Sequence, residues 1–272
     1  MKKIFFSILF LLVLALASGW VYLRRFEFAA LYHPAAEIST TPAQFQLRYQ
    51  EVQFVASDGT PLYGWWVPAN RPRGTIVYCH GNSGNIGDIA YLGPQFFKRR
   101  FNVLFWDYRG FGRSGGRPSE AGLYDDARAA YDAAAAMSGK LPIVVYGLSL
   151  GSAVAVQLAK DRPAAALIVE AGFASAADMA RRWYPSLPLD RLISVSYDSA
   201  AKVATLEGLP KLFGHSTDDT VVPFQSGRIL HAAAASPKTF ALLSGGHEDS
   251  SWLTPGGAGN SELEAFLDRF GR

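Results

Sequence analysis

The sequence predicts an α/β fold class: a doubly wound, mostly parallel sheet covered by helices and preceded by an N-terminal hydrophobic helix. Two observations lead to this prediction. Short apolar runs, each four to six residues long, recur at residues 75–79, 102–106, 142–147, 166–171, 211–214 and 239–243. Longer helical patterns alternate with them, at residues 86–99, 119–137, 152–161, 224–235 and 262–270. Continuous apolar runs of this length are typical of strands buried on both faces, which a parallel sheet under helices provides.

Residues 1–25 differ from the rest of the chain and are predicted to form a membrane anchor. Lys2 and Lys3 precede an uncharged run over residues 4–23, and two arginines close it. A helix rises about 1.5 Å per residue, so this run is long enough to cross a hydrocarbon core about 30 Å thick. The alternative is a signal peptide, because residues 15–17 (Ala-Leu-Ala) resemble a cleavage site. We favour a retained anchor, since the apolar run continues past that site.

The charges that flank the apolar run are nearly balanced, with two lysines before it and two arginines after it. The short leader that opens with lysines is typical of a bacterial chain whose amino terminus stays in the cytoplasm. We therefore expect the rest of the chain on the external, periplasmic side. Secretion after cleavage and a domain that faces the cytoplasm are the alternatives.

Composition limits what the remaining chain can be. The 272 residues are 49% hydrophobic and 18% charged, which is typical of a globular protein with a substantial core. The formal charge of +3, without a basic cluster, argues against nucleic acid as a partner. The single cysteine, Cys79, lies in an apolar run, where we expect a buried and inert thiol. None of these quantities predicts an oligomeric state.

The chain after the anchor is predicted to contain a linker at residues 26–44 and one domain over residues 45–272. This domain begins with apolar segments at residues 51–55 and 62–67. The turn sequence Ser-Asp-Gly-Thr lies between them, which predicts a β-hairpin.

One stretch, at about residues 172–206, interrupts the alternation of strands and helices. Pro185 and Pro188 prevent a single long helix there. An insertion next to the carboxyl edge of a sheet is a candidate cap over a binding site. An ordinary crossover helix with a long approach is the alternative, and the sequence favours neither.

The strongest chemical motif is Gly147-Leu148-Ser149-Leu150-Gly151, which lies between a predicted strand and a predicted helix. In this context a G-x-S-x-G sequence forms a sharp, crowded turn, and its glycines leave room beside the serine. Such a turn lifts the serine Oγ above the sheet edge, at a helix N-terminus, where developing negative charge is favoured. Ser149 is therefore the candidate nucleophile.

A serine hydroxyl needs a base, and the base needs a carboxylate that orients it. In proteins that carry this strand–turn–helix motif, the order along the chain is nucleophile, acid, base. His33 and His80 precede the nucleophile, and His215 precedes a pair of adjacent aspartates. His231 lies in a predicted helix of small residues, where packing explains it. His247 follows the last predicted strand through a flexible Ser-Gly-Gly loop and is the predicted base.

An oxyanion hole needs two backbone N–H donors. We expect one from Leu150, directly after the nucleophile. The other is expected from the glycine-containing loop at residues 80–85, where Asn82 is the predicted donor. His80 is then interpreted as a structural hydrogen-bonding residue. No ligand spacing supports a metal site, and we expect neither a metal nor a cofactor.

Taken together, these motifs resemble those of the α/β-hydrolases, in particular a small membrane-anchored, serine-aminopeptidase-like branch. That branch includes depalmitoylating thioesterases and lysophospholipase-like enzymes. The resemblance covers roughly residues 45–270 and rests on HGNSGN, DYRGFGRSGG, YGLSLGSA, ARRWYPSLP, HSTDDTVVP and GGHED. It implies an α/β-hydrolase fold with a short cap insertion.

The resemblance also assigns the acid. In the family pattern the acid stands four residues after the histidine that opens its motif, which is Asp219 here. Its neighbour Asp218 is interpreted as a turn or capping residue, because adjacent side chains in an extended stretch point to opposite sides. Glu170 is a reserve candidate, because some relatives place the acid after that strand. We expect Asp107 and Arg109 to form an ion pair that braces a loop beside the site.

These expectations describe a serine hydrolase of acyl esters or thioesters that works through an acyl-enzyme. Ser149 attacks, His247 moves the proton and Asp219 holds the tautomer of the imidazole. A membrane anchor beside such a site favours small-molecule or lipid acyl substrates, or acylated proteins. The alternatives are a peptidase of aminopeptidase type and a catalytically silent scaffold tethered to the membrane.

Overall fold

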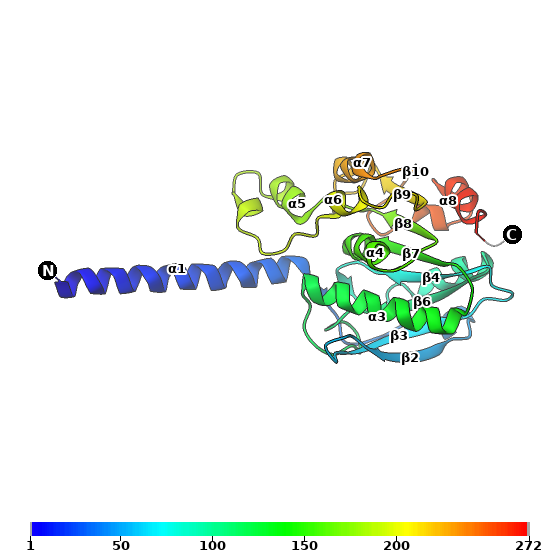
Figure 1. Ribbon diagram of the computed structural model, residues 1–272, viewed down its shortest axis with the longest axis horizontal. Helices are drawn as coiled ribbons and strands as arrows, with labels where there is room; N and C mark the ends of the chain where they lie inside the picture. The colour runs from blue at the N-terminus through cyan, green and yellow to red at the C-terminus, as the bar shows by residue number, and fades with distance from the viewer. Residues whose placement is uncertain (1, 271–272) are drawn as a thin grey trace.

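The six apolar runs form six parallel strands within an eight-stranded sheet in the computed structural model, which describes residues 2–270 (Figure 1). Every residue of five of these strands is buried, which explains why the runs are continuously apolar; the sixth, β10, lies at the edge of the sheet. The strands are β4 (Gly74–Cys79), β6 (Phe101–Asp107), β7 (Ile143–Leu148), β8 (Ala166–Glu170), β9 (Lys211–Ser216) and β10 (Lys238–Leu243).

The predicted β-hairpin completes the other edge of the sheet. Strands β2 (Gln50–Val55) and β3 (Pro61–Val67) pair antiparallel with each other, and β3 pairs antiparallel with β6. The strand order is β10-β9-β8-β7-β4-β6-β3-β2. From β4 the chain builds outward to β6 and then crosses back to β7, so the order reverses between β4 and β7. In open α/β sheets, ligands bind outside the carboxyl ends of the strands at such a reversal.

Helices cover both faces of the sheet, as a doubly wound fold requires. Along β4, Val77 packs into a core that includes side chains of α3 and α4, whereas Ile76 and Tyr78 pack into a second core with α2 and α8. The helices of the domain are α2 (Gly93–Lys98), α3 (Glu120–Ser138), α4 (Leu150–Asp161), α5 (Ala176–Trp183), α6 (Ser199–Val203), α7 (Phe224–Ala233) and α8 (Asn260–Leu267). The short 3-10 turns are η1 (Pro42–Phe45), η2 (Ala90–Leu92), η3 (Leu189–Arg191) and η4 (Ser251–Leu253).

The predicted helix at residues 86–99 is much shorter in the structure. Only α2 is α-helical, and it begins just before Pro94, whose ring suits the first helical turn. The preceding residues form a turn instead, because the carboxylate of Asp88 accepts the backbone N–H of Asn85. Local side-chain hydrogen bonding of this kind competes with helix formation.

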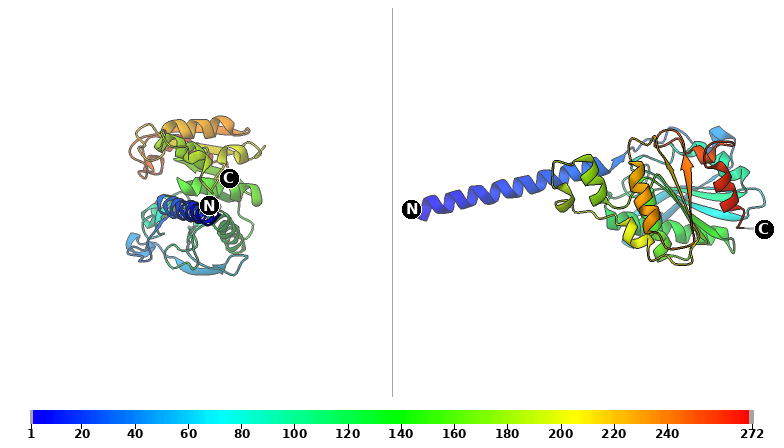
Figure 2. Two further views of the ribbon diagram at one scale, coloured as in Figure 1. Left: turned by 90° about the vertical axis from the view of Figure 1, so that its left-hand side faces the viewer. Right: turned by 90° about the horizontal axis from the view of Figure 1, so that it is seen from above.

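The helix α1 (Lys2–Leu31) extends from the domain as a long rod (Figures 1 and 2). It is long and apolar enough to cross a membrane, although a signal sequence would meet the same criterion. The predicted linker at residues 26–44 is wrong in its first part, because residues 26–31 continue this helix. They contain no helix breaker, and Glu27 among them is buried against the domain.

The segment after α1 is also built into the domain. Strand β1 (His33–Pro34) pairs in parallel with β5 (Ser83–Gly84), which lies in the loop after β4. The stretch predicted to be a linker is thereby attached to the loop that was predicted to supply the oxyanion donor.

The stretch at residues 172–206 divides into two parts. Its first part, with α5 and η3, lies beside α1 at the end of the molecule from which α1 extends (Figures 1 and 2). Helix α5 begins where Ser175 caps it by accepting the backbone N–H of Asp178, and it ends before Pro185. The second part contains α6, which packs against α4 as a crossover helix does.

Candidate active site

Ser149 lies on a strained turn between β7 and α4, at the carboxyl edge of the sheet. Its backbone angles are φ +55° and ψ −121°, which a residue with a side chain rarely adopts. A Cβ atom at Gly147 would lie 2.2 Å from the carbonyl oxygen of Gly151, and one at Gly151 would lie 2.0 Å from that of Cys79. Both glycines are therefore required for the turn that presents Ser149.

The structure brings Ser149, His247 and Asp219 together in a hydrogen-bonded row. The Nε2 atom of His247 lies 2.8 Å from Ser149 Oγ, and its Nδ1 atom lies 2.7 Å from Asp219 Oδ2. A carboxylate only accepts hydrogen bonds, so Nδ1 carries the hydrogen and Nε2 is left to accept from the serine hydroxyl. These three residues come from the loops after β10, β7 and β9, which meet at one edge of the sheet.

Asp219 is held by more than His247. Its Oδ1 atom accepts the backbone N–H groups of Val221 and Val222, each at 2.8 Å. The Nε2 atom of His215 lies 3.3 Å from its Oδ2 atom. Burial raises the pKa of Asp219, but hydrogen bonds from His215 and His247 outweigh it and hold this pKa well below its ordinary value. Asp219 is therefore a carboxylate at neutral pH.

The neighbouring carboxylate, Asp218, does not take part in this row. Its side chain is exposed, and its backbone N–H donates to Ser216 Oγ in the turn. The role of His215 beside the acid was not predicted from the sequence. The spacing of four residues between His215 and Asp219 is the signal that could have indicated it.

Glu170, the reserve acid, lies in a different environment. It is buried beneath the site, where the hydroxyl of Tyr146 donates to its carboxylate. Burial raises its pKa, the opposite of what holds for Asp219. Its backbone carbonyl accepts the N–H of Ser149 at 3.0 Å, so Glu170 supports the turn through its main chain.

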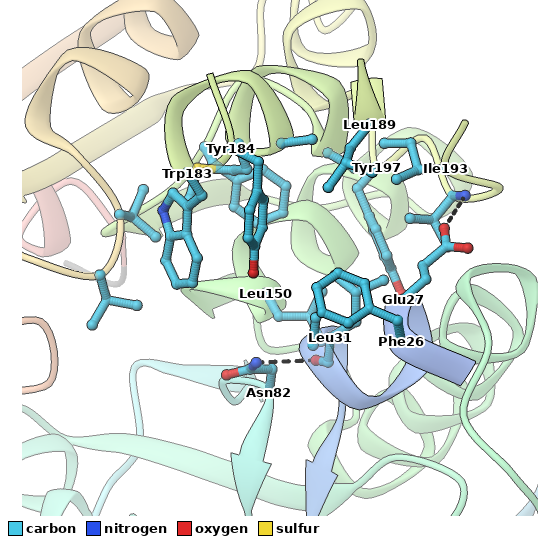
Figure 3. A pocket seen from close by; sticks show the side chains of 18 of the residues that line it. Phe26, Glu27, Leu31, Asn82, Leu150, Trp183, Tyr184, Leu189, Ile193 and Tyr197 are labelled. Carbon is cyan, nitrogen blue, oxygen red and sulfur yellow. Dashed lines mark hydrogen bonds between the residues drawn. The ribbon is translucent and has the colours of Figure 1, made fainter. Parts of the chain in front are cut away.

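The residues predicted to supply the oxyanion donors are Leu150 and Asn82. Leu150 is the first residue of α4, and the first four N–H groups of a helix have no acceptor within it. Among residues 2–270, the backbone N–H of Asn82 has no hydrogen-bond acceptor. Both residues line the same cavity as Ser149 (Figure 3). The side chain of Asn82 is used elsewhere, since its amide donates to the carbonyl of Leu31 at 3.0 Å.

The predicted pair between Asp107 and Arg109 is wrong. Arg109 instead forms an ion pair of 2.7 Å with Asp126, while Asp107 lies 3.6 Å from Nε2 of His80. Burial raises the pKa of Asp107 to about 7 and lowers the pKa of His80 to about 4. The Nδ1 atom of His80 lies 2.8 Å from the carbonyl of Gly81, which agrees with a structural role. Within residues 2–270, no three His, Cys, Asp or Glu side chains are arranged to hold a metal ion.

Ser149 is one of the residues that line an apolar cavity of about 160 Å³, and Figure 3 shows other residues of its walls. Side chains of α5 and the following loop form one wall, among them Trp183 and Ile193. The last turns of α1 form another wall, with Phe26 and Leu31. The sequence did not predict that α1 reaches the site. The acidic Glu27 inside an otherwise apolar helical stretch is the signal that could have indicated a buried contact there.

A doubly wound sheet with a serine on a strained strand–turn–helix junction defines the class of the α/β-hydrolases. Comparisons with known proteins agree. A family model described as "Serine aminopeptidase, S33" matches residues 70–196. The uncharacterized protein Rv2307c of Mycobacterium tuberculosis is 35% identical over 252 residues, which cover 89% of this chain and 88% of that protein.

Two further comparisons extend this result. The α/β-hydrolase domain-containing protein WAV2 of Arabidopsis thaliana is 32% identical, with 88% of this chain and 86% of that protein covered. The solved structure of the Pyrococcus furiosus esterase Pf2001 superposes with a TM-score of 0.69 and 18% identity, and it covers 89% of this chain and 98% of that chain. The chain belongs to the α/β-hydrolase family. The fold class predicted from the sequence is confirmed.

Proposed function

We propose that this protein is a serine hydrolase that cleaves acyl esters or thioesters through an acyl-enzyme. In this proposal Ser149 is the nucleophile, His247 the general base and acid, and Asp219 the residue that orients His247. The observation that carries it is the row of two short hydrogen bonds, 2.8 Å and 2.7 Å long, that links the three side chains on a turn of the required geometry.

In the first half of the reaction, Ser149 Oγ attacks the acyl carbonyl carbon and its proton moves to Nε2 of His247. The oxyanion that forms accepts hydrogen bonds from the backbone N–H groups of Leu150 and Asn82. The bond from carbon to the alkoxide oxygen or thiolate sulfur then breaks, and His247 returns the proton to that leaving group. In the second half, His247 takes a proton from water, whose oxygen attacks the carbonyl carbon of the acyl-enzyme. The bond from that carbon to Ser149 Oγ then breaks, His247 returns the proton to Oγ, and the carboxylic acid leaves.

Ester or thioester cleavage is favoured over an aminopeptidase activity by the character of the cavity. An aminopeptidase needs a carboxylate for the ammonium group of its substrate. Among the residues that line the cavity, Glu27 is the acidic one. Its carboxylate is already engaged, since it pairs with Arg24 at 2.6 Å and accepts the backbone N–H groups of Ser194 and Val195. The remaining lining is mostly apolar, which suits an acyl group.

The nucleophile is tested by labelling with a fluorophosphonate probe. We expect the wild type and the surface variant Ser261→Ala to react and Ser149→Ala to remain unlabelled. Labelling of Ser149→Ala at the wild-type rate would rule out this nucleophile. A panel of an acetyl ester, a palmitoyl thioester and an aminoacyl amide tests the bond that is cleaved. Preference for the amide would favour the peptidase, and a folded wild type that neither labels nor hydrolyses would favour the silent scaffold.

We further propose that α1 is retained as a membrane anchor, with the amino terminus in the cytoplasm and the catalytic domain outside. Support comes from the apolar length of α1 and from the burial of Glu27 near its end. A periplasm-dependent reporter fused after residue 272 is expected to be active. Activity only of a cytoplasm-dependent reporter would reverse this topology.

A further inference from the structure

The cavity at Ser149 is enclosed in part by the helix that is proposed to cross the membrane. Leu23, Phe26 and Leu31 of α1 line it, and Figure 3 labels the last two. These positions share one side of the helix, because residues three to four apart lie above one another and eight residues span two turns and a fraction. The opposite wall comes from α5 and the loop that follows it. The cavity is thus a space between α1 and the cap, and Ser149 is among the residues that line it.

Glu27 fastens the two walls together. Its carboxylate accepts the backbone N–H of Ser194 at 2.7 Å, the hydroxyl of Ser194 at 2.9 Å and the backbone N–H of Val195 at 3.0 Å. Arg24, one turn earlier on α1, pairs with Glu27 and donates to the carbonyl of Leu192. Hydrogen bonds to an ionised group are roughly twice as strong as neutral ones. The end of α1 and the loop at residues 192–195 are therefore joined by several hydrogen bonds to charged groups.

The outer end of the cavity lies at the predicted surface of the bilayer. The uncharged run of α1 ends at Leu23, and Leu23 is also the first residue of α1 that lines the cavity. The cap carries large apolar side chains that are about half exposed, namely Trp183 (51%), Leu187 (53%) and Leu192 (49%). Apolar patches of this kind mark membrane or partner contacts. The cap that carries these side chains lies beside α1, at the end of the domain from which α1 extends toward the proposed bilayer (Figure 1).

We propose that this cavity binds a long acyl chain of a membrane lipid ester, which passes from the bilayer between α1 and the cap to Ser149. The end of α1 is then part of the acyl-binding site and sets which chain lengths fit. The inference rests on the proposed function, since it assigns a substrate class to the same nucleophile. Ala30 on α1 lines the cavity, whereas its neighbour Ala29 does not, so the two positions form a matched pair for a test.

The experiment compares Ala30→Phe with Ala29→Phe in the full chain, reconstituted in phosphatidylcholine vesicles. Hydrolysis of p-nitrophenyl palmitate and p-nitrophenyl acetate is measured as kcat/KM. A pocket that loses room for a single methylene group discriminates by about 10- to 200-fold. We therefore expect Ala30→Phe to lower the palmitate-to-acetate ratio at least about tenfold, and Ala29→Phe to leave this ratio at its wild-type value. An unchanged ratio in Ala30→Phe, or an equal change in both variants, overturns the proposal.

A second measurement uses the wild type alone and does not depend on the folding of Ala30→Phe. Labelling rates with a hexadecyl and an ethyl fluorophosphonate are compared in the same vesicles, and we expect the hexadecyl probe to react faster. Faster reaction of the ethyl probe overturns the acyl site but leaves the nucleophile in place, whereas no labelling by either probe overturns the proposed function itself. Release of fatty acid from the vesicle lipid supports a lipid source; cleavage only of an S-palmitoylated peptide in these vesicles rejects it.

Discussion

Replacement of Asp219 by asparagine is expected to reverse the hydrogen bonding at one end of His247. In the wild type, Oδ1 of Asp219 accepts the N–H groups of Val221 and Val222, and Oδ2 accepts from His247 Nδ1. The oxygen of an asparagine amide must stay with the two backbone donors, so its nitrogen faces His247. An amide nitrogen only donates. The imidazole therefore carries its hydrogen on Nε2, where it cannot accept the proton of Ser149.

The size of the effect separates this explanation from a simpler one. In serine hydrolases, replacing the aspartate by an asparagine that holds the histidine in the wrong tautomer lowers kcat by about 10⁴. At about 1.36 kcal/mol for each factor of ten, this is about 5.5 kcal/mol of transition-state stabilisation. A single lost hydrogen bond to a charged group costs about 1.5–3 kcal/mol, which corresponds to about 10- to 150-fold. A fall in kcat of about 10³–10⁴ in Asp219→Asn therefore indicates a change in the tautomer of His247 rather than the loss of a single hydrogen bond.

The assay is ester hydrolysis at pH 7 by the full chain, with Asp218→Asn as the matched control. Asp218 is exposed and lies outside the hydrogen-bonded row, so the kcat of Asp218→Asn is expected to stay within about twofold of the wild type. KM is expected to change little in either variant, since neither carboxylate lines the cavity. Equal losses in the two variants, or a loss below about 100-fold in Asp219→Asn, would refute the reasoning.

Three further variants test other parts of the structure. Gly151→Ala places a Cβ 2.0 Å from the carbonyl oxygen of Cys79 and is expected to lower the free energy of unfolding by at least about 3 kcal/mol; an unchanged melting temperature would contradict this. Burial raises the pKa of Asp107 from its ordinary value of 3.8 to about 7, so its contribution to stability is complete below pH 4 and lost as the pH rises to 7. Asp107→Asn should therefore gain stability relative to the wild type between pH 5 and pH 8 in denaturant unfolding, and a constant difference would argue against it. Glu27→Ala removes the carboxylate that accepts from Ser194 and is expected to lower hydrolysis of p-nitrophenyl palmitate more than that of p-nitrophenyl acetate. Equal losses for the two esters would show that the contact between Glu27 and Ser194 does not shape the cavity.

The strands and the nucleophile turn could be predicted because their causes are local in the sequence. A strand buried on both faces must be apolar at every position, as the run over β7 is. The turn at Ser149 needs glycines at fixed offsets, because side chains at Gly147 and Gly151 would overlap backbone atoms. Both patterns therefore depend on only a few neighbouring residues and can be recognised in the sequence.

Long-range pairing is where the sequence was insufficient. Asp107 and Arg109 lie two residues apart and were expected to pair. Instead, Asp107 accepts the backbone N–H of Ile86 and Arg109 pairs with Asp126. The same holds for Glu27, whose hydrogen-bond donor Ser194 is 167 residues away in the chain. Charge and spacing identify residues that need a partner, but the tertiary fold determines which distant residue becomes that partner.

Asn82 joins the end of helix α1 to the loop after β4. As an oxyanion donor it needs only its backbone N–H, which any residue except proline supplies. Its other two polar groups serve the end of α1: the side-chain amide donates to the carbonyl of Leu31, and its backbone carbonyl accepts the N–H of His33 at 2.8 Å. The carbonyls in the last turn of a helix receive no N–H from within the helix, so the carbonyl of Leu31 needs a donor from elsewhere. The asparagine at this position is thus explained by its contacts with the end of α1 rather than by the proposed chemistry, and the position of the proposed oxyanion donor depends on where α1 ends.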